Sequence, residues 1–167
     1  VLRMTQCVSC QVGCAMACTF CATGQMGFVR NMTMGEILGQ ILVAREYLGE
    51  TEEEPRLRNI VFMGMGEPLL NFKAVMASLE ILLDETACKL SLRRITVSTG
   101  GLQKVVLALG ASNLAYLAVS LHAPTQALRE KIMPKAAHWH LDDLISTLAK
   151  YPLKTRERLT FEYLLLG

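Results

Sequence analysis

The residues best suited to chemistry are cysteines, and three of them stand together in the string GCAMACTFCATG. Cys14, Cys18 and Cys21 have the spacing C-x3-C-x2-C, and Cys7 and Cys10 lie just upstream with the spacing C-x2-C. Thiolates are soft ligands that bind zinc, copper and iron–sulfur clusters. Five of the six cysteines crowd into one short segment, which is too local for disulfides that tie a fold together. The cysteines therefore indicate a metal site.

Two kinds of metal site fit these cysteines. Structural zinc usually has four protein ligands, so zinc would need Cys7 or Cys10 as the fourth. Residues 6–12 are predicted to form a strand, and the odd spacing of the two cysteines then puts them on opposite faces. Gly13 and Gly24, near the ends of the loop, instead favour a loop that wraps an iron–sulfur cluster. With three cysteine ligands such a cluster keeps one iron free, and an open position marks a catalytic metal rather than a structural one.

The elements that must position the cysteines are short apolar strands alternating with amphipathic helices. Thr33 and Glu36 form a predicted capping box at the start of the first helix, and Gly49 is its predicted stop. This alternation predicts right-handed βαβ units and a parallel sheet. The predicted strands are 59–63, 94–98, 115–121 and 159–165, and the later helices include Val75, Leu79 and Leu82 or cover 102–109, 126–132 and 141–150.

Polar and glycine-rich strings follow the predicted strand ends, namely GMGEP, STGG and SLHAP, as well as the cysteine loop. Each string taken alone has an ordinary explanation, such as a turn with Pro68 at a helix start or a serine that caps a helix. In parallel α/β folds, however, ligands bind at the carboxyl edge of the strands. Four such strings at one edge therefore predict a ligand site there.

The composition sets broad limits on what the chain can be. Its 167 residues are 51% hydrophobic and 6% aromatic, which suits one domain with a buried core. No signal peptide opens the chain and no apolar run is long enough to span a membrane, so we expect a soluble, cytoplasmic protein with reduced thiols. The formal net charge of +2 points to no particular partner. Lys89, Arg93 and Arg94 form a local basic group that we interpret as solvated surface.

The cysteine spacing, with the aromatic Phe20 just before the third cysteine, resembles that of the radical S-adenosylmethionine enzymes. The strings CVSCQVGC, CTFCATG, FMGMGEPLLN, TVSTGG and VSLHAPT further resemble the adenine-C2 RNA methyltransferases of the RlmN/Cfr type. The resemblance covers essentially the whole chain and implies a partial (β/α)6 TIM-like barrel, here truncated after about five strands. Residues 1–167 would be an incomplete core domain, with an RNA-binding domain before it and a further segment after it.

The resemblance also implies site residues and cofactors. Cys14, Cys18 and Cys21 would bind a 4Fe–4S cluster, and S-adenosylmethionine would occupy its open iron and give a 5′-deoxyadenosyl radical on one-electron reduction. Six residues would contact that cofactor at its methionine end, ribose and adenine: Gly66, Glu67, Ser98, Ser120, Leu121 and His122. Cys10 stands where the family usually has serine, and we interpret it as a bystander thiol.

The implied reaction is methylation of C2 of adenine in 23S ribosomal RNA and in transfer RNA. The methyl-carrying cysteine and a proposed base glutamate would lie outside these residues, so we expect no catalytic side chain here and no full turnover by the chain alone. The implied partners are RNA and an electron donor such as flavodoxin or ferredoxin, with a monomeric protein and no membrane. Two alternatives stay open: a radical enzyme with another substrate, including adenine C8, or a zinc-binding structural or RNA-binding module.

Overall fold

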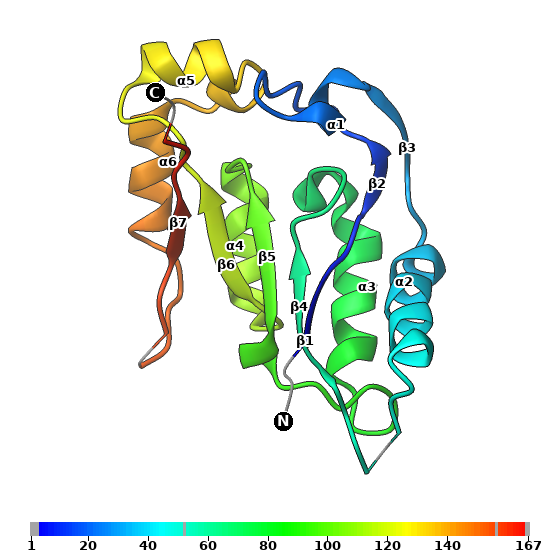
Figure 1. Ribbon diagram of the computed structural model, residues 1–167. Coiled ribbons are helices and arrows are strands. Elements are labelled where there is room, and N and C mark those ends of the chain that lie inside the picture. The colour runs from blue at the N-terminus through cyan, green and yellow to red at the C-terminus, as the bar shows by residue number, and fades with distance from the viewer. Residues whose placement is uncertain (1–3, 52, 156, 166–167) are drawn as a thin grey trace.

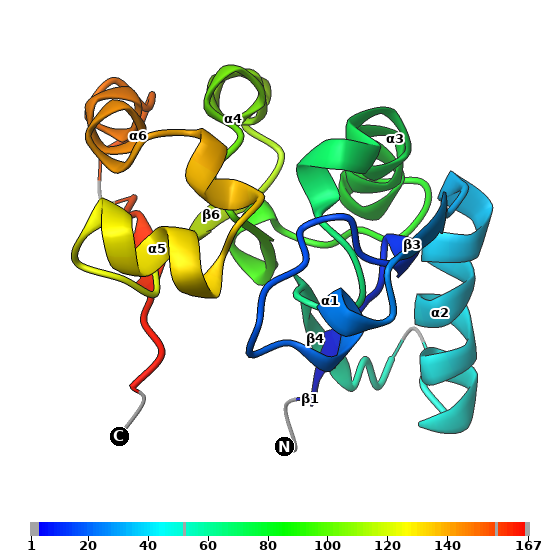
Figure 2. The same ribbon diagram turned by 90° about the horizontal axis from the view of Figure 1, so that it is seen from above.

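The computed structural model describes residues 4–51, 53–155 and 157–165, and its centre is a curved parallel sheet. The strand order is β1-β4-β5-β6-β7, and each neighbouring pair is parallel. This confirms the predicted parallel α/β fold, and the curvature gives an incomplete barrel (Figures 1 and 2). The strands are β1 Met4–Cys7, β4 Leu57–Phe62, β5 Ile95–Thr99, β6 Tyr116–Ser120 and β7 Thr160–Glu162.

Helices surround this sheet in two positions. Four of them lie along its convex face, while α1 and α5 lie over the carboxyl edge of the strands (Figures 1 and 2). The bounds are α1 Ala22–Gln25, α2 Met34–Tyr47, α3 Phe72–Leu83, α4 Gln103–Ser112, α5 Gln126–Ile132 and α6 Leu141–Leu148, with 3-10 turns at Pro68–Asn71, Leu92–Arg94 and Ala136–His138. Among the described residues, every helix is too short or too polar to cross a lipid bilayer.

The predicted start and end of the first helix are confirmed in α2. The Thr33 hydroxyl accepts a hydrogen bond from the Glu36 amide at 3.2 Å, and the Glu36 carboxylate accepts one from the Thr33 amide at 2.8 Å. The helix gives way at Gly49, which has a φ of +59°. The predicted helix over 126–132 coincides with α5, and Val75, Leu79 and Leu82 bury one face of α3 as expected.

The prediction of one strand over residues 6–12 is wrong. The chain instead forms β1, leaves the sheet over Val8–Cys10, and then forms β2 (Gln11–Gly13). This second strand pairs antiparallel with β3 (Phe28–Asn31), so the cysteine segment is the connection within a long hairpin that also contains α1. The cause is a pairing between distant residues, which the local apolar pattern does not reveal.

Candidate functional site

The cysteine loop connects β2 to α1 and lies over the carboxyl edge of the sheet (Figure 1). The Thr19 amide donates to the Ile132 carbonyl at 2.9 Å, which ties the middle of the loop to the last residue of α5. The Cys21 amide donates to the Cys18 carbonyl at 3.1 Å, and the Cys14 amide donates to the Gly27 carbonyl at 2.9 Å. The loop therefore has a defined backbone, with all three of its cysteines half-buried.

The three thiols of this loop lie near enough to influence one another. Burial raises the pKa of Cys18 to about 11, and the charges of Cys14 and Cys21 add to that rise. Burial also raises the pKa of Cys14, while backbone amides of Met16 and Gly66 lower it, the Met16 nitrogen lying 3.5 Å from the sulfur. Thiolates gathered here are unfavourable without compensating positive charge, such as that of bound iron. The donor set fits an iron–sulfur cluster.

The two upstream cysteines contribute little to such a site. Cys7 is exposed on β1, and Cys10 is 2% exposed with its sulfur 3.6 Å from the Met65 carbonyl oxygen. Cys10 lies outside any strand, so the predicted opposite faces of one strand do not explain the separation of the two thiols. No group of three or more His, Cys, Asp or Glu side chains in the described ranges could hold a single metal ion.

The GMGEP turn connects the cysteine loop to the sheet. Gly66 has a φ of +103°, and a Cβ built there would lie 2.5 Å from Cβ of Gln11, so only glycine fits. The Gln11 side chain accepts from the Glu67 amide at 2.9 Å and donates to the Asn31 side chain at 2.8 Å. Pro68 begins a 3-10 turn, as predicted for a helix start. Side-chain bonds thus hold the turn against the base of the hairpin.

Glu67 is 4% exposed, and its carboxylate points into the protein. It accepts hydrogen bonds from the Gly100 amide at 2.7 Å and from the Leu69 amide at 3.1 Å. Burial raises its pKa, while these bonds and one from the Thr99 hydroxyl act in the opposite direction. The carboxylate therefore fixes the STGG turn rather than pointing to solvent.

Ser98 and Ser120 lie near the carboxyl ends of the neighbouring strands β5 and β6, and they share a carboxylate that the sequence does not predict. Glu162 Oε2 accepts from Ser98 Oγ at 2.8 Å and from Ser120 Oγ at 2.7 Å, and the two hydroxyl oxygens are 3.4 Å apart. Glu162 also offers its backbone carbonyl to the amide of Leu121 at 3.1 Å. The available signal was a lone acidic residue within the apolar string LTFEYLL at the end of the fifth predicted strand.

His122 brings the SLHAP turn to the cysteine loop. Its ring meets that of Phe20 edge to face, with centroids 5.0 Å apart and an angle of 80°. Its φ is +55°, an uncommon conformation for a side chain of this size. Burial lowers the pKa of His122, and the nearby Arg129 lowers it further, while Glu162 opposes both. The aromatic residue before the third cysteine therefore has a partner in another predicted turn.

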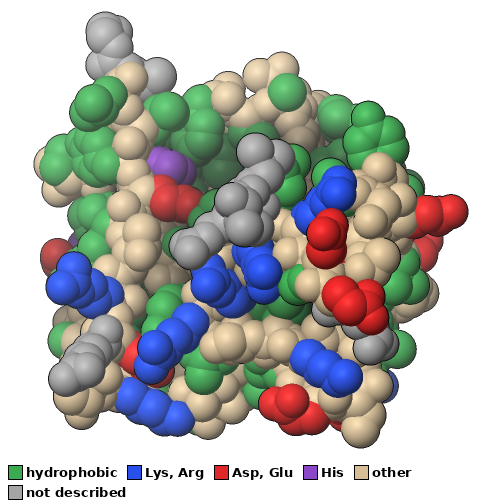
Figure 3. Space-filling view, turned by 60° about the horizontal axis from the view of Figure 1, so that its bottom comes forward, with side chains coloured by type: hydrophobic (Ala, Val, Ile, Leu, Met, Phe, Trp, Pro, Cys, Tyr) green, Lys and Arg blue, Asp and Glu red, His purple; other side chains and the backbone are tan. Residues whose placement is uncertain are grey.

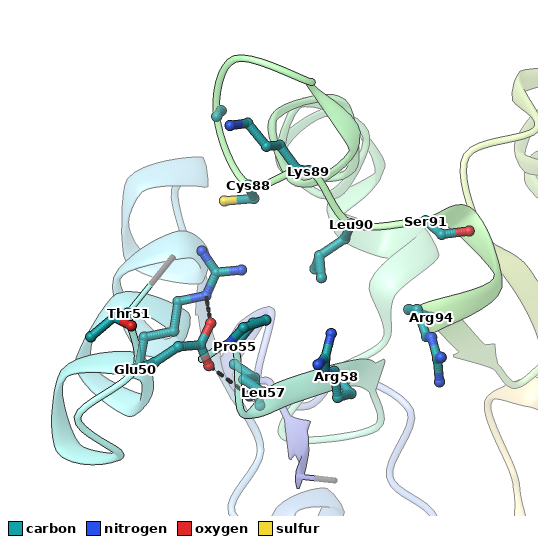
Figure 4. A pocket seen from close by; sticks show the side chains of 12 residues that line it. Glu50, Thr51, Pro55, Leu57, Arg58, Cys88, Lys89, Leu90, Ser91 and Arg94 are labelled. Atoms are coloured by element: carbon teal, nitrogen blue, oxygen red, sulfur yellow. Dashed lines mark hydrogen bonds and ion pairs between the residues drawn. The ribbon is translucent and has the colours of Figure 1, made fainter. Parts of the chain in front are cut away.

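The local basic group lies at the opposite edge of the sheet. Lys89 and Arg94 line a pocket of about 530 Å³ together with Arg58 and Cys88, beside the amino ends of β4 and β5 (Figure 4). Another cation of this pocket, Arg45, is paired with Glu50 at 3.4 Å. The structure thus brings together the cysteine loop and the three polar turns and leaves this basic group apart from them.

Comparisons with known proteins agree with this geometry. The family model described as "Radical SAM superfamily" matches residues 8–167. A protein of Nitratidesulfovibrio vulgaris named "Dual-specificity RNA methyltransferase RlmN" is 70% identical over 167 residues, and one of the same name from Lawsonia intracellularis is 57% identical. The crystal structure of a radical SAM methyltransferase from Sphaerobacter thermophilus is 45% identical over 96% of this chain, with a TM-score of 0.89.

The chain spans about half the length of the relatives it matches. It corresponds to 46% of the Nitratidesulfovibrio protein, 47% of the Lawsonia protein and 47% of the Sphaerobacter chain, while 99%, 99% and 96% of its own length are covered. The similarity therefore applies to nearly all of this chain and to one half of those proteins.

Proposed function

We propose that this chain, which belongs to the radical SAM superfamily, is the cofactor-binding core of an RNA methyltransferase. The proposed reaction is methylation of C2 of adenine in ribosomal and transfer RNA. The names of relatives at 70% and 57% identity support this substrate class. The observation that carries the proposal is the meeting of a loop of three thiols with three polar turns at one edge of the sheet.

We assign Cys14, Cys18 and Cys21 as ligands of a 4Fe–4S cluster. Two observations support this assignment: the three cysteines share one half-buried loop, and the charges of Cys14 and Cys21 raise the pKa of Cys18. When bound, the cluster supplies the electron that cleaves S-adenosylmethionine. The residues proposed to contact that cofactor are Gly66, Glu67, Ser98, Ser120, Leu121 and His122, on the three turns that border the loop.

The chain's own residues bind and orient in this proposal. The backbone at Gly66 approaches closely because no Cβ is present, and its carbonyl can accept from an ammonium group. The pair Ser98 and Ser120, with Glu162 between them, presents hydroxyl and carboxylate groups that suit hydroxyl-bearing ligands. The half-buried His122 ring offers an aromatic face whose lowered pKa keeps it neutral near pH 7.

The remaining partners follow from the same proposal. Reduction of the cluster needs an electron donor, for which a flavodoxin or ferredoxin is suited. We propose that residues 1–167 are part of the core domain of a monomeric protein in the cytoplasm, where RNA and low-potential electron donors are both present. In this proposal the methyl-carrying cysteine and the base lie outside residues 1–167.

Iron loading of the chain tests the cluster assignment. After anaerobic reconstitution with iron and sulfide, we expect a brown protein with about four irons per chain. Cys14→Ala, Cys18→Ala and Cys21→Ala should each lose most of the iron, whereas the matched controls Cys7→Ala and Cys88→Ala should keep it. A colourless protein that binds one zinc would contradict the assignment.

A chimera tests the reaction. The matching half of the Nitratidesulfovibrio protein is replaced by this chain and expressed in bacteria that lack their own adenine-C2 methyltransferase, and methylated adenine in RNA is measured by mass spectrometry. We expect 2-methyladenosine with the chimera and none with its Cys18→Ala form. A chimera that loads four irons yet leaves C2 unmethylated would contradict the reaction while retaining the cluster.

A further inference from the structure

Arg129 is the most deeply buried cation of the described residues, and it sits beneath the site. Its side chain, on α5, is 0% exposed, although arginine is almost never fully buried without a charged partner. Its guanidinium donates to the carbonyls of Ser120 at 3.1 Å and Leu121 at 2.7 Å through one nitrogen. The other terminal nitrogen donates to the Gly100 carbonyl at 2.5 Å. Arg129 therefore joins the SLHAP and STGG turns.

No carboxylate balances this charge within the described part of the chain. Arg129 takes part in none of the ion pairs found there, all its oxygen acceptors are neutral carbonyls, and its Nε has no partner. Glu67 holds the amide of the same Gly100 whose carbonyl Arg129 holds, but the two side chains form no ion pair. A buried charge without a counter-charge is costly, so this position is unfavourable for stability alone.

The cysteine loop is bonded to α5, the helix that carries Arg129, and it would gain negative charge once its thiols bind a cluster. The end of α5 holds the loop directly, through the Ile132 carbonyl and the Thr19 amide at 2.9 Å. Viewed from above, α5 and the cysteine loop are neighbours over the same edge (Figure 2). A seven-residue helix thus carries both the cation and the anchor of the loop.

We propose that Arg129 is a positioning residue that supplies the counter-charge for the three thiolates and the cluster they bind, while it holds the two turns in register. This rests on the proposed function, because the counter-charge acts on the cluster. A buried positive charge favours the more negative, reduced form of a nearby cluster, so it raises the reduction potential. Without this charge, one-electron reduction by a given donor becomes less favourable.

Two substitutions separate the charge from the hydrogen bonds. Arg129→Lys keeps the charge and loses the planar fork, whereas Arg129→Gln loses the charge and keeps an amide donor. After anaerobic reconstitution, iron is counted and the midpoint potential is measured by dithionite titration followed by electron paramagnetic resonance. We expect the glutamine variant to lower the equilibrium constant for reduction at least tenfold, a shift of about 59 mV for one electron. The equilibrium constant for reduction of the lysine variant should stay within tenfold of that of the unsubstituted chain.

Arg94→Gln is the matched control, because Arg94 is exposed at the far edge and should leave the potential unchanged. A fully loaded Arg129→Gln protein with an unchanged potential would overturn the proposal. If the glutamine variant does not fold or load iron, the lysine variant decides alone. An equilibrium constant for reduction within tenfold of that of the unsubstituted chain supports the counter-charge, and a larger drop contradicts it. If the unsubstituted chain itself binds no iron, the proposed function fails instead, so the two failures are distinguishable.

Discussion

The two edges of the parallel sheet hold their charged side chains in opposite ways. At the carboxyl edge Glu67 and Arg129 are buried, and each bonds to backbone groups of the turns around it. At the amino edge Lys89 and Arg94 are exposed around a pocket of about 530 Å³. Figure 3 shows Lys and Arg side chains gathered on that amino-edge face, and Figure 4 shows how the pocket residues lie.

This difference separates charges that fix structure from charges that water screens. A buried ion interacts strongly because the surrounding dielectric is low, and each of its hydrogen bonds determines where a turn lies. An exposed cation interacts with water and salt, and its removal disturbs little. Substitutions at the carboxyl edge should therefore cost much more stability than similar substitutions at the amino edge.

The largest effect should come from removing the buried carboxylate. Glu67→Ala leaves the amides of Gly100 and Leu69 without an acceptor, and each buried donor left unsatisfied costs about 1–3 kcal/mol. We expect the free energy of unfolding, measured in urea, to fall by about 2–6 kcal/mol. The matched control is Glu54→Ala, whose side chain is 74% exposed beside Arg56, with an expected change within about 0.5 kcal/mol. Similar losses for both variants would remove the distinction between the edges.

A smaller effect should separate two glycines with positive φ. A Cβ at Gly66 would clash with Gln11 at 2.5 Å, while a Cβ at Gly49, near the amino edge, meets nothing within 4 Å. Gly49→Ala should cost about 1 kcal/mol, from backbone conformation alone. Gly66→Ala adds overpacking, so we expect about 2–4 kcal/mol in thermal or urea unfolding. If the two alanine variants were equally stable, the close packing of the GMGEP turn would be unimportant.

Features that neighbouring residues decide can be predicted from the sequence. The capping box at Thr33 and the apolar spacing in α3 involve residues within one or two helical turns, so the sequence pattern is sufficient. The four polar strings were also placed at one edge correctly, because parallel strands bring their carboxyl ends together. These are features that periodicity and strand direction determine.

Features that distant residues decide cannot be predicted from a local pattern. The pairing of Gln11 with Asn31 turns the cysteine segment into a hairpin, and no local pattern distinguishes that from one long strand. Burial of Arg129 depends on carbonyls 8, 9 and 29 positions away, which an isolated arginine in a helix does not reveal. Glu162 was missed for the same reason, since its partners Ser98 and Ser120 belong to two other strands.

The smallest effect concerns pH, and here a buried and an exposed carboxylate should act with opposite sign. Burial raises the pKa of Glu67 above its ordinary 4.5, so the folded protein keeps a proton that the unfolded chain has lost. Its contribution to stability therefore falls as pH rises from 4.5 through the raised pKa. The exposed Glu36 has the opposite pH dependence, because its hydrogen bond with Arg30 lowers its pKa to about 2. Its contribution is present above pH 4.5 and is lost as pH falls towards about 2.

Unfolding curves across pH 2 to 8 of the unsubstituted chain, Glu67→Gln and Glu36→Gln test these signs. The difference in stability between the unsubstituted chain and Glu36→Gln should be present above about pH 4.5 and disappear as pH falls towards about 2, and it should stay small, since an exposed ion pair is screened by solvent. The difference for Glu67→Gln should change above that pH, because the glutamine variant lacks the carboxylate that ionises there. If both differences changed in the same direction over the same range, Glu67 would titrate like a surface group. The carboxyl edge would then not exclude water as its burial implies.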